Sequence, residues 1–257
     1  MNGSSVPRIV HLPETGSTNA DAMRLALSGE ELPLWVLADR QTGGRGRSGR
    51  AWASEPGNLH ASVAFRCEAP LEKAGQLSLL AGIAVIDAVR ATMDLAPGTD
   101  LRLKWPNDIL IGRAKAGGIL VESTSARAGS GFLAVLGFGL NLITSPGALG
   151  RAVTALGQYG KPPEPLAFTE TLSEKIFSWL DSWRGGEGFS EIREAWLQRA
   201  GAVGEPIVIN TAAGPLSATY QGLSETGALL ADVDGEIKEI SYGDVMLVSQ
   251  VAGDETS

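Results

Sequence analysis

From Gly204 onward the chain consists of short runs of strand-forming residues separated by turns. The runs are EPIVI, PLSATYQGL, GALLADV, EIKEI and DVMLVS, and glycines stand between most of them. Short strands at regular spacing are typical of small sandwiches and barrels. We therefore expect a small all-β domain over residues 203–250, followed by a tail at 251–257.

The first 202 residues alternate between strand-like and helix-like segments, which predicts one larger domain. Apolar runs predict strands over residues 8–12, 34–38, 59–65, 101–103, 109–111, 118–122 and 132–138. Apolar residues at helical spacing predict helices from residue 18 to about 29 and over 71–93, 164–183 and 190–200. Thr18 and Asp21 have the spacing of a helix-capping box. The expected class is α+β, with a mixed or antiparallel sheet, helices and the C-terminal β domain.

The charge balance argues against a nucleic-acid partner. The chain has 21 Lys and Arg against 29 Asp and Glu, a formal net charge of −8, whereas a phosphate-backbone binder needs clustered positive charge. The single cysteine, Cys67, excludes an intrachain disulfide and a thiolate metal cage. His11 and His60 do not stand at metal-ligand spacing, so we interpret both as structural or incidental.

No targeting or membrane segment is expected. The start, MNGSSVPRIV, lacks the basic flank and apolar core of a signal peptide. Residues 128–150 are uncharged and long enough to span a bilayer, but Asn141, Pro146 and several polar residues favour strands and loops there. The expected location is the cytoplasm.

The strongest chemical signal is QTGGRGRSGRAW at residues 41–52. It concentrates Arg45, Arg47 and Arg50 in an acidic chain, and a guanidinium can contact a phosphate or carboxylate through two parallel hydrogen bonds. The intervening glycines let backbone amides approach an anion closely. The composition therefore suits a small polyanion such as a nucleotide, although a mobile basic surface loop has the same composition.

Two better-known glycine motifs do not fit this loop. The glycines at 44, 46 and 49 match G-x-G-x-x-G, but the turn SEPG at 54–57 follows where a dinucleotide-binding fold requires a helix. A P-loop needs Gly-Lys-Ser/Thr at its end, which this loop lacks.

Four further segments carry polar groups at the ends of expected elements. KWPND at 104–108 places a cation, an amide and a carboxylate on one turn, although the same residues are also typical of an ordinary structural hairpin. KAGGILVE at 115–122 places Lys115 just before a glycine pair and an expected strand. The Lys115 ammonium is then either held at the edge of a cleft or exposed to solvent. GFGLN has two strand glycines, which indicate a close approach by a backbone or ligand, and it ends at Asn141. The expected start of a helix carries Ser17, Thr18 and Asn19, whose hydroxyl and amide groups can contact a polar ligand there.

Taken in this order, the motifs resemble those of the biotin–protein ligase catalytic domain. The matching segments are Ser-Thr-Asn at 17–19, Gln41 with GRGRSGRAW at 44–52, KWPND at 104–108, KAGGILVE at 115–122 and GFGLN at 137–141. The resemblance implies a fold of the class II aminoacyl-tRNA synthetase and biotin ligase type, with an SH3-like C-terminal barrel. Some family members carry an N-terminal DNA-binding domain. Sixteen residues precede Ser17, so we expect the short form without a repressor function.

The resemblance implies a two-step reaction. Biotin and Mg-ATP form biotinyl-5′-adenylate and pyrophosphate, and the biotinyl group then passes to a lysine of a biotin carboxyl carrier domain. The expected enzyme is thus a biotin–[biotin carboxyl-carrier protein] ligase. Its Mg²⁺ arrives with ATP, and no residue of this chain is predicted as a metal ligand.

The resemblance also assigns roles to individual residues. Those expected to bind biotin are Ser17, Thr18, Asn19, Gln41, Gly44, Arg45, Gly46, Arg47, Lys115 and Gly118. Those expected to bind ATP are Arg47, Arg50, Trp52, Lys104, Asn107, Lys115 and Asn141. Arg47 and Lys115 are the expected catalytic residues, because a carboxylate attacking a phosphate brings two anions together and cations must offset their repulsion. Asp108 is either an orienting or proton-accepting partner in the second step or a structural turn carboxylate.

Other interpretations compete with a biotin ligase. Lipoate–protein ligases share the fold and the adenylation step but usually lack the GRGRxGR loop and KWPND. A non-catalytic sensor of biotinyl-adenylate would be expected to lose Arg47 or Lys115, and both are present. An RNA-binding module does not fit the charge or the lack of interleaved aromatic residues. Family members occur as monomers and dimers, so a homodimer is possible. Residues 142–166 match the family only loosely, at VTAL, so no adenine-stacking residue is predicted.

Overall fold

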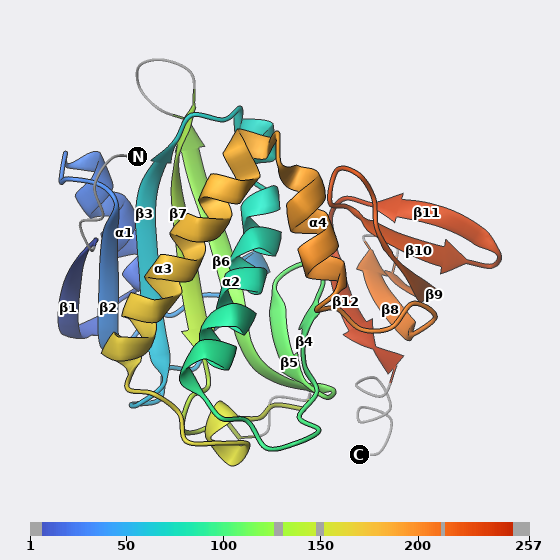
Figure 1. The fold of residues 1–257 in the computed structure, drawn as a ribbon, viewed down its shortest axis with the longest axis horizontal. Coiled ribbons are helices and arrows are strands. Elements are labelled where there is room, and N and C mark those ends of the chain that lie inside the picture. The colour runs from blue at the N-terminus through green and yellow to red at the C-terminus, as the bar shows by residue number, and fades with distance from the viewer. Residues whose placement is uncertain (1–6, 126–130, 148–151, 212–213, 249–257) are drawn as a thin grey trace.

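A seven-stranded mixed sheet forms the body of the protein (Figure 1). This computed structural model describes residues 7–125, 131–147, 152–211 and 214–248. The strands follow the order β1-β2-β3-β7-β6-β5-β4, with β1 and β2 parallel and the other pairs antiparallel. Their bounds are β1 Arg8–Thr15, β2 Leu34–Gln41, β3 Leu59–Cys67, β4 Leu101–Lys104, β5 Asp108–Ile111, β6 Ala114–Ser125 and β7 Phe132–Leu140.

Helices cover both faces of this sheet, which explains why its central strands are continuously apolar. On one face α1 (Thr18–Leu27) packs Ala22 and Ala26 against Val36 and Val135. The other face carries α2 (Gln76–Thr92), α3 (Pro165–Trp183) and α4 (Phe189–Leu197), which cross the front of the sheet in Figure 1. The buried α2 lies in the centre of the main core.

The C-terminal strands form a separate five-stranded antiparallel sheet of the order β11-β10-β9-β8-β12. The bounds are β8 Pro206–Thr211, β9 Gly214–Leu223, β10 Leu229–Val233, β11 Glu236–Ile240 and β12 Asp244–Leu247. This sheet contacts the main body through Trp105 Nε1, which donates to Gly227 O at 3.1 Å, and through the partly buried ion pair Arg102–Glu205 at 2.9 Å. The predicted class, an α+β fold with a small SH3-like C-terminal sheet, is confirmed.

The capping-box prediction was wrong. Ser17 is the N-cap of α1, and none of the described side chains caps the helix. The Thr18 hydroxyl instead bonds to Gln41 and Ser62, and the Asp21 carboxylate accepts from Thr15 and Arg24. Both predicted capping groups are therefore engaged in tertiary contacts.

The segment at 128–150 contains β7, as expected, while residues 128–130 and 148–150 lie outside the described part of the chain. None of the helices in the described ranges combines the length and apolar composition that a bilayer crossing requires. The predicted tail at 251–257 also lies outside the described residues.

Candidate active site

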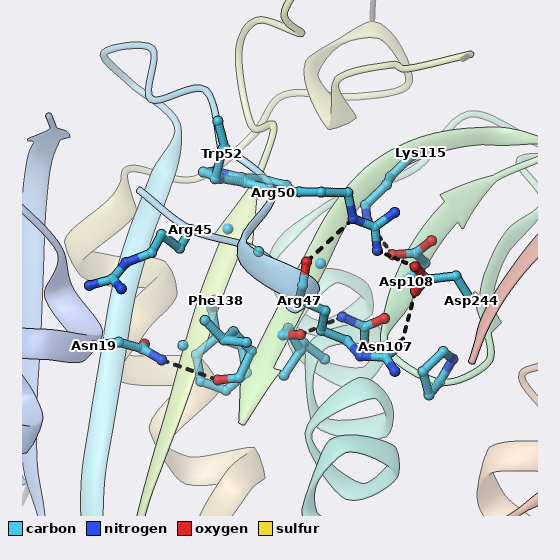
Figure 2. Close-up of a pocket in the computed structure, with 18 of the residues that line it drawn as sticks. Asn19, Arg45, Arg47, Arg50, Trp52, Asn107, Asp108, Lys115, Phe138 and Asp244 are labelled. Carbon is cyan, nitrogen blue, oxygen red and sulfur yellow. Dashed lines mark hydrogen bonds and ion pairs between the residues drawn. The ribbon is translucent and has the colours of Figure 1, made fainter. Parts of the chain in front are cut away.

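Most of the predicted binding residues gather around one cavity between the main sheet and the C-terminal sheet (Figure 2). Its walls come from the start of α1, the loop after β2, the β4–β5 turn, β6, β7 and β12. The predicted residues that line it are Ser17, Thr18, Asn19, Gln41, Arg45, Gly46, Arg47, Arg50, Trp52, Lys104, Asn107, Lys115 and Gly118. Gly44 and Asn141 do not line it, and their proposed ligand contacts stay predictions.

A hydrogen-bonded network of uncharged side chains, anchored at one end by the Glu122 carboxylate, forms one side of the site. Gln41 Oε1 accepts from Thr18 N at 2.9 Å and from Thr18 Oγ1 at 3.1 Å. Thr18 Oγ1 lies 2.7 Å from Ser62 Oγ, and Ser62 Oγ donates to Asn19 Oδ1 at 2.6 Å. Asn19 Nδ2 then donates to Glu122 Oε2 at 2.7 Å. The side chains are thus fixed before a ligand arrives.

The segment QTGGRGRSGRAW at residues 41–52, called the Gly/Arg loop from here on, crosses the cavity as a tight hairpin. Gly46 N donates to Arg50 O at 2.7 Å, and Trp52 N donates to Gly44 O at 2.9 Å. A Cβ at Gly44 would lie 2.9 Å from Trp52 O, so the two sides of the hairpin need a glycine there. Gly44 therefore allows the two sides of the hairpin to approach each other, although it does not line the cavity.

Two loop arginines share one carboxylate from the C-terminal sheet. Arg47 Nη1 lies 3.3 Å from Asp244 Oδ1, and Arg50 Nη2 lies 2.7 Å from Asp244 Oδ2. Arg47 Nη2 also donates to Gly243 O at 3.2 Å, and its guanidinium lies 5.8 Å from the centre of the Tyr242 ring. Figure 2 shows both arginine side chains extending toward Asp244, while Arg45 extends to the opposite side of the site.

A second carboxylate, Asp108, lies between two lysines. Lys104 Nζ lies 2.9 Å from Asp108 Oδ2 and donates to Val245 O at 2.6 Å, and Lys115 Nζ contacts Asp108 Oδ1. Burial raises the pKa of Asp108, but the charges and hydrogen bonds of Lys104 and Lys115 outweigh this effect and hold that pKa well below its usual range. Asp108 is therefore ionised at neutral pH and a weak proton acceptor. This favours an orienting role over a proton-accepting one.

The two strand glycines of β7 make room for side chains of the site. A Cβ at Gly137 would lie 2.0 Å from Asn19 Oδ1, and a Cβ at Gly139 would lie 2.4 Å from Trp52 Cε2. The Trp52 ring also lies against Gly118, and Lys115 Nζ is 5.8 Å from the ring centre. The sequence predicted that a backbone or a ligand would approach these glycines, but in the structure the side chains of Asn19 and Trp52 occupy that space.

Asn141 holds a neighbouring segment of chain rather than facing the cavity. Its Nδ2 donates to Thr154 O at 2.9 Å, and Leu156 N donates to Asn141 O at 2.8 Å. Thr154 N in turn donates to Lys115 O at 3.0 Å. Asn141 therefore helps to fix the backbone of Lys115 through the VTAL segment.

The sequence indicated the cations of the site but not all of its anions and hydroxyls. Ser62 and Asp244 were not predicted: Ser62 is one polar residue in an apolar strand, and Asp244 follows a turn in the other sheet. Among the described residues, no group of three or more His, Cys, Asp and Glu side chains lies together as a metal centre would require.

Comparison with known proteins agrees with this geometry. Residues 12–141 match the biotin/lipoate A/B protein ligase family, and residues 203–248 match the biotin protein ligase C terminal domain. A biotin–[acetyl-CoA-carboxylase] ligase of Paracoccus denitrificans is 37% identical over 230 residues, covering 85% of this chain and 92% of the relative. The enzyme of the same name from Mycobacterium tuberculosis is 32% identical over 249 residues, covering 95% of this chain and 90% of the relative.

The fold agrees as well. The structure of the biotin protein ligase from Aquifex aeolicus in complex with biotin and ATP superimposes with a TM-score of 0.77 at 26% sequence identity, covering 93% of this chain and 99% of the other. The chain therefore belongs to the biotin/lipoate A/B protein ligase family and, within it, to the biotin–protein ligases.

Proposed function

We propose that the chain joins biotin to a carrier protein in two steps at this cavity. The carboxylate oxygen of biotin attacks the α-phosphorus of ATP, the bond to pyrophosphate breaks, and biotinyl-5′-AMP forms. The neutral amine of a carrier lysine then attacks the biotinyl carbonyl carbon and loses a proton, and AMP leaves with the electron pair of the broken C–O bond. The single observation that carries this proposal is the convergence of Arg45, Arg47, Arg50, Lys104 and Lys115 on one cavity of an acidic chain.

The two sides of the cavity suit the two ends of biotin. The hydrogen-bonding groups of Thr18, Asn19 and Gln41 are uncharged and suit a neutral ureido ring. Lys115 and Arg47 lie on the cationic side, where a carboxylate and an α-phosphate can be held close together. Holding the two reactants in this geometry supplies much of the rate enhancement that an adenylating enzyme needs.

We further propose that the Gly/Arg loop moves when the substrates bind. The cavity has a volume of about 130 Å³, below the roughly 300–1,000 Å³ of common ligand pockets. Arg47 and Arg50 lie across it, joined to Asp244. Phosphate oxygens would replace Asp244 as their partner, and the loop would then close over the adenylate and exclude water from a hydrolysable anhydride.

Mg²⁺ fits this site as a companion of ATP. Among the described lining residues the carboxylates are Asp108 and Asp244, and each already contacts two cations. Mg²⁺ is often held mainly by substrate phosphates and waters. We therefore propose that the phosphates of ATP carry the ion, which lowers their negative charge, while the arginines and lysines orient them.

The remaining proposals concern organisation and partners. We propose a catalytic domain at 1–202, an SH3-like domain at 203–250 and a tail at 251–257, in a cytoplasmic enzyme that modifies a biotin carboxyl carrier domain. The net charge of −8 supports a protein that binds no operator DNA. Light scattering would separate a monomer from a homodimer, and tight, salt-sensitive binding to a specific DNA sequence would contradict the DNA proposal.

One incubation separates the competing functions. The protein is mixed with Mg-ATP, a carrier domain and either biotin or lipoate, and the carrier is weighed by intact mass spectrometry. We expect a mass gain with biotin alone. A gain with lipoate alone would indicate a lipoate ligase, and pyrophosphate release without any gain would indicate a sensor that forms the adenylate but does not transfer it.

A further inference from the structure

Two buried polar atoms beside the site have no hydrogen-bond partner in the described structure. They are Trp52 Nε1 and His60 Nδ1. His60 is 1% exposed and lies on β3. An unsatisfied buried polar group is destabilising and rare in folded proteins, so each of these atoms calls for an explanation.

The two atoms lie on the same face of the sheet. His60 is paired directly with Gly139 of β7, and a Cβ at Gly139 would lie 2.7 Å from Trp52 Nε1. Cβ positions of directly opposed residues on one face are about 4.5–5.5 Å apart. The indole nitrogen is therefore within side-chain reach of His60. Ser62, two residues along the same strand, contacts Asn19 of the binding network, so this face is the one that carries the site.

The two atoms are chemically complementary. His60 Nε2 lies 3.3 Å from Glu55 O, and because a carbonyl oxygen only accepts, Nε2 must carry the proton. Burial lowers the pKa of His60, and the hydrogen bond and charge of Glu55 offset this only in part, so the ring is neutral and Nδ1 is an acceptor. An indole N–H is a donor only.

We propose that His60 is a positioning residue of the ligase, whose Nδ1 accepts a hydrogen bond from Trp52 Nε1 when the loop closes over its substrates. The bond would fix the plane of the indole between Gly118 and Gly139, beside Lys115. The imidazole would then join the loop to the sheet at two points, at Glu55 through Nε2 and at Trp52 through Nδ1. This inference rests on the proposed function, because it assigns Trp52 to the nucleotide side of the same site.

Two substitutions separate positioning of Trp52 from anchoring of Glu55. In H60N the amide oxygen can take the place of Nδ1 as an acceptor, and the contact with Glu55 is lost. In H60Q the terminal amide can still donate to Glu55 O, and the acceptor for Trp52 is lost. We expect H60Q to raise the KM for ATP by roughly 2- to 10-fold with little change in the KM for biotin, the range that one hydrogen bond contributes. H60N should stay within about twofold of the parent enzyme in the same assay.

A double mutant and a spectroscopic measurement complete the test. In a W52F background the indole donor is absent, so adding H60Q should change the KM for ATP no further. The indole N–H signal of Trp52, identified by its loss in W52F, should shift on addition of biotin and ATP in the parent and in H60N but not in H60Q. H11N is the matched control, since His11 is exposed, lies on the far edge strand β1 and hydrogen-bonds to Asp39 rather than to a residue of the site.

The opposite pattern, with H60Q unchanged and H60N impaired, would overturn the proposal and leave His60 as an anchor of Glu55. Equal defects in both variants together with an unshifted Trp52 signal would overturn it as well. Absence of biotinylation by the parent enzyme would instead contradict the proposed function. The two failures are therefore distinguishable.

Discussion

Replacing Asp108 by asparagine tests how strongly the site depends on one buried carboxylate. Asparagine keeps the size of the side chain and one acceptor oxygen but removes the charge that Lys104 and Lys115 share. All three side chains are 12% exposed, so water cannot replace the missing charge well. Breaking a buried ion pair by removing one partner destabilises a protein by about 3–5 kcal/mol.

D244N is the matched control for this change. Asp244 also contacts two cations, Arg47 and Arg50, but its side chain is 27% exposed and that of Arg50 is 54% exposed. Ion pairs that water can reach contribute about 0–1 kcal/mol. At about 2–4 °C per kcal/mol for a domain of this size, we expect the unfolding midpoint to fall by about 6–20 °C in D108N and by no more than about 4 °C in D244N.

The pH dependence of stability gives a second check on D108N. The pKa of Asp108 is lower in the folded than in the unfolded chain, where it is about 3.9. The carboxylate therefore contributes its stability above that value, and the contribution is lost as the pH falls below it. The difference in unfolding midpoint between the parent and D108N should be full at pH 6 and should narrow below about pH 4.

Thermal unfolding followed by circular dichroism measures the unfolding midpoints and their pH dependence. Pyrophosphate release, assayed at a temperature below the lowest of these midpoints, measures adenylation. We expect D108N to be slow in adenylation even where it is folded, because Lys115 loses the partner that places its ammonium. The reasoning is refuted if D108N unfolds within 2 °C of the parent, or if D244N is destabilised as strongly as D108N.

Three further predictions concern the same site. K115A should reduce pyrophosphate release severely while circular dichroism stays that of the folded protein; release at the parental rate would remove Lys115 from the reaction. G139A should impair adenylation, because the new Cβ would lie 2.4 Å from the Trp52 ring. In the control G46A the nearest described atom to the new Cβ is Arg50 O at 3.7 Å, so the folded structure and its unfolding midpoint should be unchanged. Protease cleavage within residues 39–51 should slow when biotin and ATP are added together, and an unchanged rate would argue against loop closure.

Apolar patterning predicted the strands and helices of the main sheet because burial follows the hydrophobic residues. It failed at the ends of elements, where hydrogen bonds decide. Residues 71–93 were expected as one helix, but α2 begins at Gln76, and Leu71–Lys73 form a separate 3₁₀ turn in which Leu71 is 42% exposed. β1 continues to Thr15 because its backbone pairs with β2 as far as Gln41.

The site was predicted where one short segment held several functional groups and was missed where distant segments meet. The arginine loop and Lys115 stand in motifs whose composition indicates anion binding. Asp244, by contrast, lies 194 residues after Arg50 in the chain, in the other sheet. No local pattern marks a single aspartate after a turn as the partner of a distant loop, so only the folded arrangement identifies it.

The distribution of charge in the cavity follows from which ion pairs are buried. Arg45, Arg47, Arg50, Lys104 and Lys115 line it against Asp108 and Asp244 among the described residues, a formal surplus of three positive charges in a chain of net charge −8. Asp108 is too buried to be exchanged, so it keeps its two lysines in place whether or not a substrate is bound. Asp244 is reached by water and holds the two arginines weakly enough for phosphate oxygens to displace it. The degree of burial thus gives the two sets of ion pairs different roles. The ion pairs of Asp108 are fixed and orient the reacting groups, whereas those of Asp244 are exchangeable and let the loop open.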